Sequence, residues 1–564
     1  MTEKNTMQNN ITYERKYVTY LDFGAAGDGV TDDFAAIYKA HEYANENSLP
    51  VVIDDGRTYY IHDTLIDGVA RSAKIRTDVN WGSASFIIDD TDIDYRDGTK
   101  RASTFIFTVE SDYPKQTVTD RAILSRLDGI GEGTTKLDIS LGYPAMLVIY
   151  DENASVFRRT GGNRSGKGAP KQELILIDSD GNVDESTPFM FGYETVTRVD
   201  IIRDDVHGVT VKGGKFTTRG CRVDAFNNET GEKAGYYARG IFINRSHTVI
   251  DGVEHYVTGE FTTYDHRDRL LEGPHYRGFY VASHANEITI KNCVLTGRRY
   301  YHVSGTYEFS GDTVNKIYLI GCTQSNFRIK DEEGKTVFSM AISPVSKTLY
   351  YWGIGGTNFC KNMEYINCTL SRFDAHQGLY NGKIIGCTMN FMELTGKGEL
   401  LVEDLDWYSP GPGETYNSLA YLRNDYGSTW EGTITFKNCT AHSSSGNFFL
   451  VQHSYTNWDY GYTCHFPNLI CENLKVEGLE EGAEVRLITE NKSIKKEPNL
   501  HLPVTVNIPE HKKEGEPSFI NKNPIVPPRF IRIIHNGEGY PVRVTKCAFL
   551  ENTELQGVTL VETE

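Results

Sequence analysis

The chain has 564 residues, of which 39% are hydrophobic and 24% charged, a globular composition without a low-complexity tract. Its formal net charge of −18 disfavours a nucleic-acid partner, because a polyanion would be repelled over most of the surface. The sequence has no apolar run of membrane-spanning length and no signal-peptide core near its start. As written, it predicts a cytoplasmic protein without a membrane partner, or a secreted one if a leader has been removed.

The first predicted element follows the stretch LDFGAAGDGVTDDFAAI at 21–37. Its glycines and aspartates match neither a phosphate-binding loop nor the spacing of an EF-hand. Asp32 is a typical helix start, and apolar residues recur at helical spacing from Phe34 to His41. Residues 32–46 are therefore expected to form a short amphipathic helix that covers the open end of a β-structure.

Farther along the chain, one short phrase recurs and ends in cysteine. It reads ITIKNC, IYLIGC, MEYINC, GKIIGC and ITFKNC, ending at Cys293, Cys322, Cys368, Cys387 and Cys439, and VRVTKC ends at Cys547. The closest cysteines are separated by roughly 20 residues, the length of one coil of a parallel β-helix. The phrase alternates apolar and polar residues, so we expect an inward ladder of cysteines, with the preceding Asn or Gly turning each corner. A cysteine metal site is disfavoured, because no zinc-type spacing occurs.

The predicted organisation is one dominant domain with two interruptions. Residues 1–20 form a polar leader, and 21–477 carry the coils. Within the coils, about 141–200 alternates like antiparallel strands with turns, which is typical of an inserted hairpin subdomain. The charged stretch 478–530 is expected to be a long surface excursion, and 531–564 returns as the final strands.

Residues Asp22–Ile61, which begin DFGAAGDGVTDDFAAI and end LPVVIDDGRTYYI, resemble the N-terminal signature of the pectate-lyase-like superfamily. That superfamily includes polygalacturonases and phage tailspike depolymerases, and the coil phrases extend the resemblance over roughly 210–550. The resemblance implies an all-β fold, a right-handed parallel β-helix (solenoid) with a short N-terminal capping helix and inserted loops or hairpins. It also implies a carbohydrate substrate, held in a cleft along one face of the coils. The catalytic motifs of polygalacturonases are mostly missing: RIK stands at 328–330, and DDVHG at 204–208 resembles two others only faintly.

Ionisable side chains are crowded between residues 239 and 302, which hold six of the 16 histidines. Two coils contain similar segments, RGIFI at 239–243 and RGFYV at 277–281. Arg239 and Arg277 are therefore expected side by side on one outer face. Two such guanidiniums can hold a carboxylate or sugar hydroxyls, and structural ion pairing is the alternative. Further candidates for substrate binding in these and the following coils are Tyr280, His284, Tyr301, His302, Trp352, Asn358 and Arg372.

The strand RFDAHQGLY at 372–380 is the first candidate for chemistry. Alternation turns Phe373 inward and leaves Arg372, Asp374 and His376 on one outer face. Asp374 and His376 would then lie about 7 Å apart at Cα, close enough for each to change the pKa of the other. A hydrogen-bonded structural pair is the alternative interpretation.

Glycosidic cleavage requires a proton donor and a second carboxylate. Asp374 is the predicted acid, with His376 beside it. Glu393 on the next coil and Asp312 on an earlier one are the candidate partners.

Three classes of function stay open. The first is a glycoside hydrolase, for which no cofactor is expected. The second is a polysaccharide lyase acting on a uronate, with Arg, Lys, His or Tyr as base and calcium as a candidate cofactor. The third is a non-catalytic glycan-binding or phage-like adhesion protein. A carbohydrate partner is common to all three, and a homo-oligomer is left open.

Overall fold

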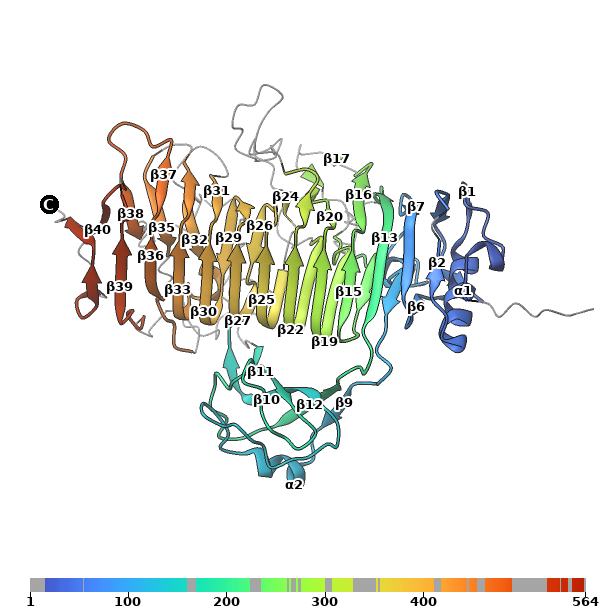
Figure 1. Ribbon diagram of the computed structural model, residues 1–564, viewed down its shortest axis with the longest axis horizontal. Coiled ribbons are helices and arrows are strands. Elements are labelled where there is room, and N and C mark those ends of the chain that lie inside the picture. The colour runs from blue at the N-terminus through green and yellow to red at the C-terminus, as the bar shows by residue number, and fades with distance from the viewer. Residues whose placement is uncertain are drawn as a thin grey trace, which may run out of the picture.

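The alternating phrases form strands that pair in parallel from coil to coil, so the chain folds as the expected right-handed parallel β-helix (Figure 1). One hydrophobic core runs along the inside of the coils. The computed structural model describes residues 16–53, 55–159, 169–223, 235–260, 263–264, 270–271, 275–299, 307–327, 351–352, 356–409, 417–443, 446–453, 462–488, 525–537, 539–545 and 550–561. Cys547 and the RIK tripeptide lie outside these residues.

The coils build three parallel sheets. The largest contains β1 (Asp28–Asp32), β2 (Val51–Val52), β3 (Thr58–Ile61), β6 (Ala73–Ile75), β7 (Val79–Asp89), β8 (Phe107–Val109), β13 (Val209–Arg219), β14 (Ile241–Ile243), β15 (Thr248–Asp251), β16 (Glu254–Thr258), β19 (Tyr280–Lys291), β20 (Val294–Leu295), β22 (Phe309–Ile320), β23 (Thr323–Gln324), β25 (Gly356–Ile366), β27 (Gln377–Ile385), β30 (Gly396–Glu403), β33 (Trp430–Lys437), β36 (Asn468–Glu472), β39 (Phe530–Ile534) and β41 (Glu554–Gln556). The second contains β26 (Arg372–Asp374), β29 (Phe391–Leu394), β32 (Ser418–Leu422), β35 (Phe448–Gln452), β38 (Val485–Ile488), β40 (Val542–Thr545) and β42 (Val558–Val561). The third contains β28 (Thr388–Met389), β31 (Asp406–Tyr408), β34 (Thr440–His442) and β37 (Lys475–Glu477).

Three two-stranded antiparallel sheets and a few short helices accompany the coils. The small sheets pair β4 (Leu65–Ile66) with β5 (Val69–Ala70), β17 (Thr263–Tyr264) with β18 (Leu270–Leu271), and β21 (Arg298–Arg299) with β24 (Tyr351–Trp352). The helices are α1 (Phe34–Asn47), α2 (Arg121–Leu124), η1 (Leu21–Phe23), η2 (Arg101–Ser103), η3 (Ser125–Leu127) and η4 (Asn424–Tyr426). None of the helices in the described ranges is long and apolar enough to cross a membrane.

Helix α1 covers one end of the stack, as the opening stretch predicted (Figure 1). The buried Asp33 carboxylate accepts hydrogen bonds from the backbone N–H groups of Ala26 (2.6 Å) and Tyr60 (3.3 Å). Asp28 likewise accepts from the N–H of Thr31 (2.8 Å). These aspartates therefore serve the architecture of the cap. The described residues hold no cluster of His, Cys, Asp and Glu that could bind a metal ion.

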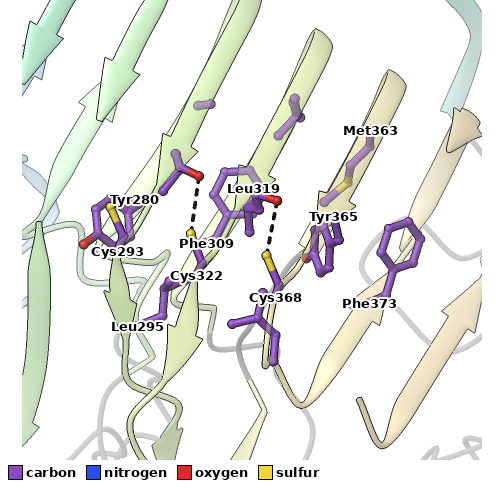
Figure 2. Packing of buried hydrophobic residues seen from close by; sticks show 14 of the residues in the cluster. Tyr280, Cys293, Leu295, Phe309, Leu319, Cys322, Met363, Tyr365, Cys368 and Phe373 are labelled. Atoms are coloured by element: carbon purple, nitrogen blue, oxygen red, sulfur yellow. Dashed lines mark hydrogen bonds between the residues drawn. The ribbon is translucent and has the colours of Figure 1, made fainter. Parts of the chain in front are cut away.

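The cysteine ladder is confirmed (Figure 2). Cys293, Cys322, Cys368 and Cys387 are buried in the core and are free thiols. The Sγ atoms of Cys322 and Cys368 contact backbone carbonyls of the preceding coil, at 3.3 and 3.2 Å. The residue before each cysteine turns the corner in the left-handed conformation, with φ of 54° at Asn292.

Between β8 and β13, the chain leaves the coils to form a small subdomain beneath the stack (Figure 1). Its antiparallel sheet contains β9 (Gln116–Val118), β10 (Ala145–Val156), β11 (Ala169–Ile177) and β12 (Arg198–Arg203). We call this the inserted subdomain; its first strand begins before the expected boundary at 141. The structure corrects the start of the excursion expected at 478–530, because Val485–Ile488 form the coil strand β38, which pairs with β35; residues 489–524 lie outside the described residues.

Buried contacts attach the inserted subdomain to the coils. The Lys361 ammonium of β25 lies 3.4 Å from a carboxylate oxygen of Glu173 and also donates to the carbonyl of Pro188 (2.6 Å). The Tyr380 hydroxyl of β27 donates to the carbonyl of Gln172 (2.8 Å). Both partners of the ion pair are fully buried, so the subdomain is held against the coils and away from water at this point.

Candidate active site

Two adjacent coils bring the predicted carboxylates together. Strands β26 and β29 pair in parallel with Asp374 opposite Glu393. Phe373 and Ala375 point into the core, so Arg372 and Asp374 lie on the outer side of the strand, as alternation predicted. Asp374 is nevertheless fully buried, because side chains from later coils cover it.

The cover consists of arginines that bind the carboxylates directly. Nη1 of Arg423 lies 3.0 Å from Asp374 and 3.2 Å from Glu393, so one guanidinium nitrogen joins the two acids. Nη2 of Arg372 lies 2.8 Å from Asp374 and also contacts Glu393. The other edge of Arg423 binds Asp425, with Nη2 3.0 Å from Oδ2.

A third arginine comes from the inserted subdomain. Nε of Arg159 donates to Oδ2 of Asp425 at 2.8 Å, and its guanidinium lies 5.7 Å from the ring centre of Tyr426. We call the resulting group the carboxylate–arginine cluster, and its members are Asp374, Glu393, Asp425, Arg159, Arg372 and Arg423. Three acids and three guanidiniums thus meet at the junction between coils and subdomain.

Two acids of the cluster have pKa values shifted in opposite directions. Burial raises the pKa of Asp374 to about 6, against the lowering effect of Arg372 and Arg423. Asp425 is also buried, but Arg423 and Arg159 outweigh that burial and hold its pKa well below the usual range. Below about pH 6, one site therefore combines an acid that is mostly protonated with one that stays ionised.

His376 lies at the edge of the cluster. Its Nδ1 is 3.0 Å from Oδ1 of Asn358, and its Nε2 is 3.3 Å from Nη1 of Arg159. Burial, together with Arg423 and Arg159, lowers the pKa of His376 well below its usual value. His376 is therefore neutral at physiological pH.

The structure places the remaining outer-face candidates on a polar row beside the cluster. Asp312 lies between Ser283 and Asn358 on three adjacent strands, and its side chain is exposed. Asn358 joins this row to His376. His284 is half-buried next to Ser283, whose hydroxyl lies 2.8 Å from its Nδ1. Asp312 thus lies one coil before Asn358 and outside the carboxylate–arginine cluster.

The structure corrects the predicted arginine pair. Ile241 pairs with Tyr280, so Arg239 lies opposite Gly278 and not opposite Arg277. A register shift of one residue turns a strand side chain to the other face. Arg277 is exposed, whereas Arg239 is turned away from the surface.

Two predicted substrate-binding residues are structural. Arg239 is 2% exposed, and its Nε lies 2.5 Å from the buried carboxylate of Asp90. Tyr280 is fully buried among the cysteines, where its hydroxyl donates to the carbonyl of Val253 at 3.1 Å. Neither side chain can meet a sugar on the outer face. Tyr301 and His302 lie outside the described residues, as does the side chain of Trp352.

The histidine-rich segment does not converge on one site in the described residues. His247 lies 2.8 Å from Asp204 at the segment that faintly resembled a catalytic motif. His255 is buried and hydrogen-bonded to Glu308. His247 therefore joins a coil to the segment after β12, and His255 joins its coil to the segment before β22.

Sequence reasoning missed Arg423, Asp425 and Arg159. The first two stand in RNDYG, where alternate charged residues flank a turn. This pattern of charged residues was visible in the sequence, but it was too short to indicate a site. Arg159 is 217 residues before His376 in the chain, and the sequence contains no local sign of their contact.

Comparisons with known proteins find relatives that are distant in sequence. No family model matches the chain. An uncharacterized 65.4 kDa protein in the cps region of Klebsiella pneumoniae is 27% identical over 155 residues, which are 26% of this chain and 24% of that protein. The match therefore spans about a quarter of the relative's length.

Several solved structures resemble the chain at low sequence identity and with TM-scores below 0.5. The tailspike gp61 of Pseudomonas phage phi297 is 10% identical with a TM-score of 0.47, covering 96% of this chain and 80% of that one. The tailspike gp49 of Pseudomonas phage LKA1 is 13% identical with a TM-score of 0.44, covering 95% and 84%. An exopolygalacturonase from Thermotoga maritima is 8% identical with a TM-score of 0.31, covering 84% and 92%. By its own coil topology, this chain has the architecture of the pectate-lyase-like parallel β-helix proteins.

Proposed function

We propose that the protein hydrolyses glycosidic bonds of a polysaccharide or oligosaccharide at the carboxylate–arginine cluster. The supporting observation is the opposite shift of two carboxyl pKa values within one cluster, upward to about 6 at Asp374 and downward at Asp425. Glycosidic cleavage uses one carboxylic acid as proton donor and one carboxylate to activate water or attack the sugar. Two acids whose environments separate their pKa values meet that requirement.

In this proposal, Asp374 protonates the leaving oxygen and Asp425 acts on water. Arg423 lies between them and binds both acids. Because Asp374 is fully buried, proton delivery requires that a bound substrate displaces the Arg423 side chain. Arg423 also binds Glu393. In this proposal, the ion pair with Glu393 remains when Arg423 leaves Asp374.

The test is incubation with a panel of plant, bacterial and host glycans, with products identified by mass. On a substrate so found, Asp374→Asn should lower kcat by several orders of magnitude, because the amide keeps the shape of the acid and has no transferable proton. Asp138→Asn is the matched control, since this exposed acid pairs with Arg126 in the inserted subdomain, outside the cluster. Near-normal turnover by the Asp374→Asn protein would contradict the assignment.

A second candidate is a lyase that cleaves a uronate-containing glycan by β-elimination. The neutral imidazole of His376 beside the cationic Arg159 favours it, because elimination needs a base and a cation near the uronate carboxylate. Product chemistry separates the two reactions: hydrolysis adds one water to the mass, whereas elimination adds none and leaves an unsaturated, ultraviolet-absorbing sugar. Dependence of the reaction on added calcium is measured in the same assay.

A further inference from the structure

The inserted subdomain reaches the candidate active site through a single described side chain. Arg159 follows β10, and its guanidinium binds Asp425 through Nε (2.8 Å) and approaches His376 through Nη1 (3.3 Å). Phe157, two residues earlier, packs against Phe359 of β25, with ring centres 6.2 Å apart. Together with the buried Lys361–Glu173 ion pair, this packing fixes the backbone from which Arg159 extends.

The hydrogen-bond chemistry of these contacts defines one form of His376. A guanidinium has donors only, so Nε2 of His376 must accept from Arg159 and carries no proton. The proton of the neutral ring then resides on Nδ1, which donates to Oδ1 of Asn358 at 3.0 Å. Protonation at Nε2 would place an N–H against a cationic donor group, which is unfavourable in a buried site.

Most of the other groups around His376 act in the same sense or are neutral, and the exception is the Asp425 carboxylate, which favours a charged ring. The ring meets Tyr426 edge-on at 5.6 Å between ring centres, and Tyr307 at 6.5 Å. The charged groups near it, from the inserted subdomain, β26 and the turn after β32, are Arg159, Arg372, Arg423 and Asp425. The guanidiniums oppose a charge on the imidazole, and the carboxylate of Asp425 is already bound by Arg159 and Arg423.

We infer that Arg159 is a positioning residue through which the inserted subdomain holds His376 in its neutral, Nδ1-protonated form in the candidate active site. The subdomain is thus part of the site and sets the state in which His376 meets a substrate. The inference rests on the proposed function only for its effect on turnover; the state of His376 itself is measured without substrate.

The decisive experiment is NMR of the full-length protein with isotopically labelled histidine. His376→Gln identifies the His376 signals by their loss. In the unaltered protein, the ring nitrogens should report the Nδ1–H tautomer and no protonation near pH 6. In Arg159→Ala, the titration of His376 should move to higher pH by about one pH unit, equivalent to a tenfold change in its protonation constant, and the single tautomer should be lost. Arg159→Lys, which keeps the cation, should retain the neutral ring.

Arg126→Ala is the matched control, because it removes an arginine of the same subdomain that binds Asp138 far from the cluster, and it should leave the His376 signals unchanged. A protonated or Nε2–H ring in the unaltered protein, or an unchanged ring in folded Arg159→Ala, would overturn the inference. If a substrate is found, the acidic limb of the pH profile of kcat/KM should move to higher pH in Arg159→Ala. Absence of turnover on every glycan refutes the proposed function alone, since the NMR result stands without it.

Discussion

At the scale of single residues, burial decides which side chains can change charge. Beneath the cap, the indole N–H of Trp81 donates to the Tyr20 hydroxyl (2.8 Å), which leaves that hydroxyl's own proton for Nε2 of His41 (3.0 Å). His41 is completely enclosed, and burial lowers its pKa from 6.5 to about 3. His41, which the sequence placed on the apolar face of the helix, therefore also makes the stability of the cap depend on pH.

We expect the cap to lose stability in acid because of His41. Its folded-state pKa lies below its unfolded-state value, so between pH 6.5 and about 3 the unfolded chain binds the extra proton. The free energy of unfolding should therefore fall as pH falls through this window, by up to about 1.4 kcal/mol per pH unit from this group. Urea unfolding at pH 7 and pH 4 should show a smaller difference for His41→Gln than for the unaltered protein. An equal pH dependence would refute the assignment.

The cysteine ladder leads to a second prediction at this scale. Cys368 is 1% exposed and lies between the cysteines of its neighbouring coils. Cys368→Asp should cost about 4 kcal/mol or more of unfolding free energy, because an unpaired charge would enter the core. Cys368→Ala should cost about 1 kcal/mol, since it removes only a small apolar group. Thr323→Asp, on an exposed strand position next to Cys322, is the control that should change little.

At the scale of elements, each coil depends on corners that ordinary residues adopt poorly. The phrase places Asn or Gly immediately before the cysteine, and these residues have positive φ values, such as 53° at Asn438. The Asn438 side chain also accepts a hydrogen bond from the amide of Asn473 on the next coil, at 3.0 Å. The corners therefore both turn the chain and join successive coils.

Substitution of Asn438 tests this role of the corners. Asn438→Val should lower the free energy of unfolding by about 1 to 2 kcal/mol, because a β-branched residue is strained in the left-handed region. Asn438→Gly should cost less, since glycine adopts this conformation freely and only the amide contact is lost. Chemical unfolding of the two variants gives the comparison. A glycine variant as unstable as the valine variant would show that the side-chain contact dominates.

At the scale of the whole molecule, the attachment of the inserted subdomain depends on a buried ion pair. Glu173 accepts from the backbone N–H groups of Met190 and Phe191 as well as binding Lys361. Glu173→Ala should destabilise the junction by about 3 to 5 kcal/mol, because the ammonium would remain buried without its partner. Limited proteolysis of the subdomain should accelerate in this variant. Glu173→Leu combined with Lys361→Met should recover part of the loss, and no recovery would contradict the ion-pair explanation.

The sequence alone determined the coils, their corners and their cap. Alternation with period two, a left-handed residue before each cysteine, and a helix with one apolar face are local patterns, and local steric and burial preferences decide them. The same alternation correctly predicted that the side chains of Arg372 and Asp374 point away from the core. The similar segments RGIFI and RGFYV misplaced Arg239 relative to Arg277, because similarity in sequence does not fix strand register to a single residue.

The tertiary structure alone decided what surrounds Asp374. Arg423 and Asp425 come from a later coil, and Arg159 from a subdomain inserted before most of the coils. Such contacts depend on the path of each insertion between two coils. A short sequence pattern contains no information about that path. The pKa values of Asp374 and His376 follow from the same cause, because burial and neighbouring charge exist only once these distant segments have met.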